Sequence, residues 1–142
     1  MRMWRLGFMV AVCSAVIAQG SADESCSAMA YGDQNQIGTK IRIRYVQGVA
    51  IDAANVPVPG VCVGVFTEPD HRLIGTVKTD DSGKFRLPSI GRGTYRLVAE
   101  YQAFGVANSL VVVGTRGERS VVVRMRPRGI DSTSYIEKSS PR

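Results

Sequence analysis

The chain has 142 residues, which is the usual size of one domain. Hydrophobic residues make up 44% and charged residues 21%, with a net charge of +6, as in ordinary globular proteins. This composition argues against a wholly disordered chain, a collagen-like chain and a multispan membrane protein.

Residues 1–20 predict a secretory signal peptide. Arg2 and Arg5 precede thirteen uncharged residues at 6–18, and small residues at Ala18 and Gly20 suit signal peptidase. The alternative is an uncleaved anchor, but a membrane span usually needs about 20 apolar residues, and the uncharged run at 6–22 has seventeen. Cleavage after residue 20 leaves 16 cationic and 12 acidic residues, a net charge of +4. We therefore expect a secreted or periplasmic protein of the cell envelope, which meets the membrane only during export.

Residues 21–39 are polar and without periodicity, so we expect an extended N-terminal segment. After cleavage, Cys26 and Cys62 remain as an even pair in an oxidising compartment. Bridging them would stabilise the fold by roughly 3–4 kcal/mol in the chain-entropy model. The alternative is two free thiols, because sequence does not place the two Cβ atoms within reach of each other.

A basic stripe follows, in which Lys40, Arg42 and Arg44 alternate with Ile41 and Ile43. The alternation favours the solvated face of a β-strand. The second interpretation is an edge or stripe that meets an acidic partner, polymer or membrane surface. No aromatic platform accompanies these charges, so we expect no nucleic-acid binding.

From residue 40 to 126, short β-type runs alternate with Gly, Pro and Asp turns, and no ten-residue window keeps a helical period. About seven such strands predict an all-β, antiparallel Greek-key sandwich. Residues 127–142 are rich in Ser, Arg and Pro, so we expect a flexible tail, with room for a short extra strand around Tyr135. The expected strands are Tyr45–Asp52, Val61–Phe66, Leu73–Thr79, Lys84–Leu87, Thr94–Tyr101, Ser109–Val113 and Ser120–Met125.

Three segments, at 48–65, 79–87 and 87–97, resemble the carboxypeptidase regulatory-like domain family. They resemble its G-x-V-x-D…P-x-P-G, T-D-x-x-G-x-F-x-L and L-P-x-G-x-Y-x-L patterns, the last with two extra residues before Gly93, and the resemblance covers about residues 45–126. It implies a seven-stranded prealbumin-like sandwich that acts as an accessory module, without peptidase activity. Val61 replaces the usual alanine of this pattern and Cys62 follows it, which favours a link peculiar to this protein.

Asp80 and Gly83 have a structural interpretation as a tight turn, in which the carboxylate accepts from backbone amides and Gly83 takes a positive φ. The alternative is a calcium loop built from Asp52, Asp80 and Asp81, but calcium prefers six to eight oxygen ligands and the pattern lacks a distal glutamate. The chain has one histidine and no nucleophile or phosphate-loop motif. We expect no catalytic residue, no cofactor and no metal site, and therefore no enzyme.

Two functions remain as hypotheses. The first is a module for protein–protein interaction or structural support, with Lys40, Arg42 and Arg44 at an open sheet edge facing an envelope protein. The second is a carbohydrate-binding module of the starch-binding-like type, which would bind an extracellular polysaccharide on exposed aromatic rings. Its candidate contacts are Phe66, Tyr101 and Phe104.

Overall fold

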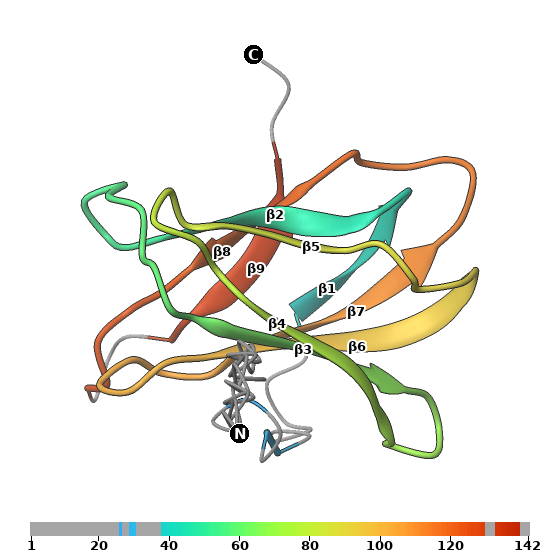
Figure 1. Cartoon of the computed structure of the whole chain (residues 1–142), viewed down its shortest axis with the longest axis horizontal. Helices are drawn as coiled ribbons and strands as arrows, with labels where there is room; N and C mark the ends of the chain where they lie inside the picture. Colours follow the sequence, from blue (N-terminus) through green and yellow to red (C-terminus); the bar gives the residue numbers. More distant parts are fainter. Residues whose placement is uncertain (1–25, 27–28, 31–37, 130–132, 140–142) are drawn as a thin grey trace, which may run out of the picture.

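The structure is a computed structural model that describes residues 26, 29–30, 38–129 and 133–139. It shows two packed β-sheets, joined by loops at both ends (Figure 1). In the described residues, no helix is long and apolar enough to cross a membrane. The predicted signal peptide at 1–20 lies outside the described residues. The strands are β1 Gly38–Ile43, β2 Val46–Ile51, β3 Cys62–Thr67, β4 Leu73–Lys78, β5 Lys84–Leu87, β6 Gly93–Glu100, β7 Ala107–Val113, β8 Val121–Arg124 and β9 Tyr135–Lys138.

The five-stranded sheet has the order β1-β7-β6-β3-β4 and the four-stranded sheet the order β5-β2-β8-β9. The predicted all-β sandwich is confirmed, but the described residues form nine strands instead of about seven. Both sheets are mixed, because β1 pairs with β7 and β2 with β8 in parallel, while the other pairs are antiparallel. The chain passes from β1 in one sheet to β2 in the other at residues 44–45, so these two consecutive strands do not form a hairpin.

The core lies between the sheets and follows the two-residue period of the strands. In β1, for example, Ile41 and Ile43 are buried while Lys40 and Arg42 are exposed. Aliphatic side chains dominate, and Tyr95 packs against the core from its margin. The buried members include Ile41, Ile43, Val46, Ala50, Val61, Val63, Val65, Phe85, Leu97, Ala99, Val111, Val113, Val121, Val123, Met125 and Ile136.

The outer face of the five-stranded sheet carries a second apolar cluster, to which the N-terminal segment contributes. Cys26 forms a disulfide with Cys62, with the two Cα atoms 5.5 Å apart. Cys26 and Met29 pack there with Phe66 and Val98, and all are buried. The expected extended segment at 21–39 is thus fixed to the sheet at its described residues, and its last two residues begin β1.

Residues 135–138 form strand β9, which is the short extra strand expected around Tyr135 within the tail. The guanidinium of Arg124 in β8 helps to hold β9 in place, because its Nε donates to Glu137 Oε1 at 2.6 Å. The same guanidinium donates to Asn55 Oδ1 in the β2–β3 loop at 2.8 Å. The hydrogen bond to Glu137 raises the pKa of Arg124 above its ordinary value, so the guanidinium of Arg124 keeps its charge.

Candidate functional site

Strand β1 lies at one edge of the five-stranded sheet, which leaves its second side outside the sheet pairing. Lys40, Arg42 and Arg44 are all exposed, while Ile41 and Ile43 are 1% and 0% exposed. The basic stripe of the sequence is therefore the solvated face of a strand, and that strand is the last one of its sheet in the described part of the chain.

The β7–β8 loop extends this basic surface. The Arg42 carbonyl accepts from the Glu118 amide, and the Arg44 amide donates to the Glu118 carbonyl, each at 2.9 Å. Arg44 Nε also donates to the carbonyl of Gly117 at 3.2 Å. These contacts hold the loop against β1, and its exposed Arg116 and Arg119 flank Glu118. We name Lys40, Arg42, Arg44, Arg116 and Arg119 the basic edge. The sequence does not indicate that Arg116 and Arg119 lie near the basic stripe, because the hydrogen bond from Arg44 to Gly117 joins residues more than seventy positions apart.

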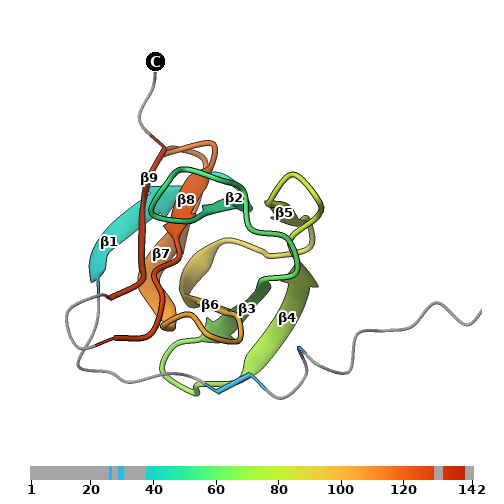
Figure 2. The same ribbon diagram turned by 90° about the vertical axis from the view of Figure 1, so that its left-hand side faces the viewer.

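A groove separates β1 from β9, the edge strand of the other sheet, and the two strands lie next to each other in Figure 2. Its volume is about 520 Å³. Ile41 and Ile136 are buried in its walls, and Tyr135 is 37% exposed beside it. Thr39, Glu137 and Lys138 complete the lining.

The aromatic residues predicted as glycan contacts do not form one platform. Phe66 is only 3% exposed, because it packs in the cluster with Cys26 and Met29, so its prediction as an exposed contact is wrong. Tyr101 is 40% exposed, and its ring centroid lies 5.9 Å from that of the half-buried Phe104. Tyr101 also lines a pocket of about 450 Å³ together with Gly60, Cys62, Lys78, Glu100, Gln102 and Arg128.

The Asp80–Gly83 segment forms a tight turn. Asp80 Oδ1 accepts from the backbone amides of Ser82 and Lys84, both at 2.9 Å, and Gly83 has a φ of +71°. Asp52 Oδ1 likewise accepts from two amides of its own loop, at 2.8 and 3.0 Å. These contacts favour the turn interpretation over the calcium alternative. Within the described ranges, no three His, Cys, Asp or Glu side chains are grouped to hold a metal ion.

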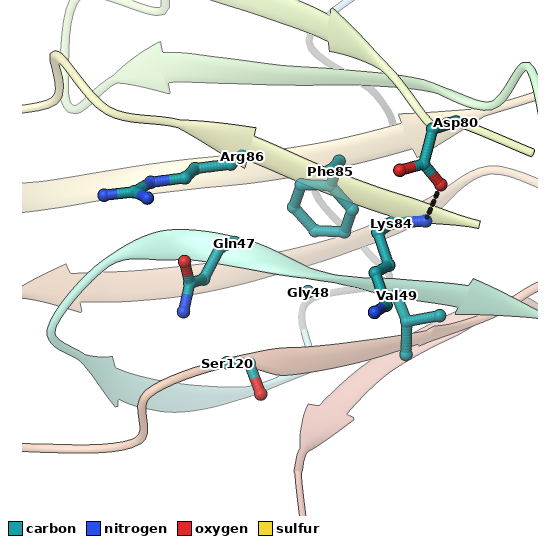
Figure 3. A pocket seen from close by; sticks show the side chains of 8 residues that line it. All are labelled: Gln47, Gly48, Val49, Asp80, Lys84, Phe85, Arg86 and Ser120. Carbon is teal, nitrogen blue, oxygen red and sulfur yellow. Dashed lines mark hydrogen bonds between the residues drawn. The ribbon is translucent and has the colours of Figure 1, made fainter. Parts of the chain in front are cut away.

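A shallow hollow of about 470 Å³ lies next to this turn, over β2 and β5 (Figure 3). Cross-strand pairing places Arg86 beside Gln47 and Lys84 beside Val49. Gln47 Nε2 donates to the carbonyl of Arg119 at 2.8 Å, so the hollow borders the loop of the basic edge. Two exposed cations beside an amide and the Ser120 hydroxyl could hold an anionic group. The sequence gives little sign of this hollow, because its lining comes from three separate segments.

Comparison with known proteins decides the family. The model described as "Carboxypeptidase regulatory-like domain" matches residues 45–126, more than half of the chain. The chain belongs to the carboxypeptidase regulatory-like domain family. No curated protein matches it.

Among solved structures, this carboxypeptidase regulatory-like domain is similar to 5-hydroxyisourate hydrolase from Klebsiella pneumoniae. The TM-score is 0.50 at 17% identity, over 68% of this chain and 93% of that one. It also matches 3-chlorocatechol 1,2-dioxygenase from Rhodococcus opacus 1CP, with a TM-score of 0.38 at 12% identity, over 78% of this chain and 64% of that one. The likeness to the hydrolase shows the fold alone, and the match to the dioxygenase carries no argument.

The family match covers β2 to β8, so β1 and β9 lie outside it. Every residue that lines the groove therefore lies outside the matched residues, as do Lys40, Arg42 and Arg44 of the basic edge. Arg116 and Arg119 of the basic edge lie inside the match, so the candidate site joins segments outside the matched residues to the β7–β8 loop within them.

Proposed function

We propose that this chain is a non-catalytic module of the secreted or cell-envelope compartment, which binds an acidic protein partner through the basic edge. The observation that carries the proposal is the position of β1 at a sheet edge, with Lys40, Arg42 and Arg44 exposed along it. The signal-peptide pattern at 1–20 and the Cys26–Cys62 disulfide support the compartment, because disulfides persist in oxidising environments.

Charge on the edge favours one class of partner over others. Exposed sheet edges pair readily with other strands, and lysine or arginine on an edge strand discourages unwanted pairing. A second copy of this chain would bring its own Lys40 and Arg42 opposite the first set, and like charges across a strand pair are destabilising. An acidic partner would not experience that repulsion. The side chains that disfavour pairing with a second copy of this chain therefore favour an acidic partner.

Cross-linking in the native envelope tests the proposal. A photoreactive residue at Thr115, an exposed position in the β7–β8 loop, samples the basic edge without removing a charge from it. We expect one recurrent protein conjugate, which the double substitution K40E/R42E abolishes. K84E/R86E is the matched control, because Lys84, Phe85 and Arg86 repeat the basic–apolar–basic pattern on β5, the edge of the other sheet.

Deletion of residues 40–45 is a poorer test, although the sequence suggests it. It would remove Ile41 and Ile43 from the core, so it would disrupt the folding of this sheet edge as well as remove its positive charges. A conjugate that persists in K40E/R42E, or one that K84E/R86E abolishes equally, would refute binding at the basic edge.

A polysaccharide is the second candidate partner, and Tyr101 is the observation that favours it. An exposed ring beside a half-buried Phe104, with Lys78, Glu100 and Gln102 around it, offers an apolar surface and hydrogen-bonding groups for a sugar. Retention of the mature protein on envelope polysaccharide, with loss of retention in Tyr101→Ala and no protein conjugate at Thr115, would favour this function over the first.

A further inference from the structure

We propose that the partner of the basic edge binds as an added β-strand in the groove between β1 and β9, and that this strand alternates acidic with apolar residues. The inference rests on the proposed function and specifies the shape and chemistry of the partner. It is argued from three features: how much of the β1 edge the β7–β8 loop covers, which residues line the groove, and which charges β1 exposes on the face that points away from the core.

Among the residues that the structure describes, those of the β7–β8 loop cover the β1 edge over part of its length. The β7–β8 loop occupies the edge at Arg42 and Arg44 through the two backbone hydrogen bonds with Glu118. The groove is lined by Thr39 and Ile41, so it opens where that cover ends. The pairing of β1 with β7 also shifts register between Gly38 and Ile41, so an incoming strand pairs with only a few residues of β1, between Lys40 and Arg42. This predicts a short contact and a weak interaction.

The groove selects the inward side chains of the added strand. Successive side chains of a strand point to opposite faces, so every second residue of a strand beside β1 would enter the groove. Ile41 and Ile136 form its apolar walls, and the phenol ring of Tyr135 is partly exposed at its margin. The charged residues of the lining are Glu137, whose carboxylate already accepts from Arg124, and Lys138, which is exposed at the end of β9. The inward residues are therefore expected to be apolar.

The outer face selects the remaining side chains. Lys40 and Arg42 are exposed on the face of β1 that points away from the core. Side chains of directly opposed residues on adjacent strands lie about 4.5–5.5 Å apart at Cβ, within reach of an ion pair. Acidic residues at alternate positions of the added strand would meet these two cations, while the residues between them fill the groove.

Peptide binding tests this pattern. The probe is a fluorescent seven-residue peptide of four glutamates alternating with three valines, titrated with the mature chain and followed by anisotropy. A peptide of the same composition with its glutamates and valines in separate blocks tests the alternation, and a peptide of lysines alternating with valines tests the charge. We expect the alternating acidic peptide to bind at least tenfold more tightly than either control.

Two variants separate the groove from the charge. Thr39→Phe places a ring in the groove and leaves the basic edge unchanged, and we expect it to weaken binding of the alternating peptide at least tenfold. Thr94→Phe is its matched control, an exposed threonine on the outer face of the same sheet that does not line the groove. K40E/R42E should abolish binding, and thermal unfolding verifies that each variant is folded.

The outcomes distinguish the two proposals. If the block peptide binds as tightly as the alternating one, or if Thr39→Phe has no effect, charge alone holds the peptide. Strand addition is then overturned, while binding at the basic edge stands. If none of the peptides binds, strand addition is also overturned, and the cross-linking experiment alone decides the proposed function. Binding that survives K40E/R42E would count against both.

Discussion

The thioether of Met29 lies directly over the backbone of Gly64. A Cβ built on Gly64 would be 2.9 Å from Met29 Sδ and 3.1 Å from Leu73 Cδ1, so a side chain at this position of β3 would have to displace the ends of these two side chains. The glycine in the middle of a buried strand is thus explained by a residue thirty-five positions earlier in the chain.

Gly64→Leu should lower the free energy of unfolding by about 1–3 kcal/mol, because the new side chain overpacks the cluster. Met29→Ala should also destabilise the fold, since it empties a buried position. The double variant should lose less than the sum of the two, because the vacated space admits the leucine, with a coupling of about 0.5–3 kcal/mol. Urea unfolding of the four proteins measures this coupling, and additive losses would show that Met29 does not cover Gly64 in solution.

Loss of the Cys26–Cys62 disulfide should destabilise the protein by about 3–4 kcal/mol, because the bridge closes a loop with a sequence separation of 36. Replacing both cysteines with serine and measuring thermal unfolding tests this value. The reduced wild-type protein is the control, and it should unfold at nearly the same temperature as the double variant. A reduced protein as stable as the oxidised one would contradict the prediction.

Thr79 should be sensitive to the loss of its hydroxyl group. The hydroxyl is buried, accepts from the Val61 amide at 2.9 Å and donates to the Val58 carbonyl at 2.7 Å. Thr79→Val keeps the shape of the side chain but leaves the Val61 amide and the Val58 carbonyl without their hydrogen bonds to it. We expect this to lower the free energy of unfolding by about 1–3 kcal/mol. Thr79→Ser keeps the hydroxyl and should cost less. Equal losses in chemical denaturation would mean that the hydroxyl contributes little.

Gly83 should not tolerate a Cβ. Its φ is +71°, and a Cβ there would lie 2.6 Å from the Ala50 carbonyl oxygen, a backbone atom that cannot move away easily. We expect Gly83→Ala to destabilise the fold by at least about 1 kcal/mol. Gly114→Ala is the matched control, because a Cβ at that position would meet nothing within 4 Å. Calorimetric unfolding temperatures that fall equally in both variants would argue against this explanation.

Local sequence determined strands β2 to β8 and the family. The alternation of Val61, Val63 and Val65 predicts one buried face, and Val63 and Val65 of β3 are buried, as is Val61 just before it. The turn at Asp80–Gly83 was also predictable, because its hydrogen bonds join residues two and four apart in the chain. Such features depend on neighbours along the sequence, which a single sequence shows directly.

Tertiary structure alone decided which faces of the strands are exposed to solvent. Phe66 alternates out of phase with the valines and so points away from the core, but Cys26 and Met29 cover it there. Lys40 and Arg42 alternate in the same way, and they stay exposed at a sheet edge. The groove between β1 and β9 joins residues almost one hundred positions apart. Periodicity assigns a side chain to a face of its strand, whereas burial of that face depends on which distant segment packs against it.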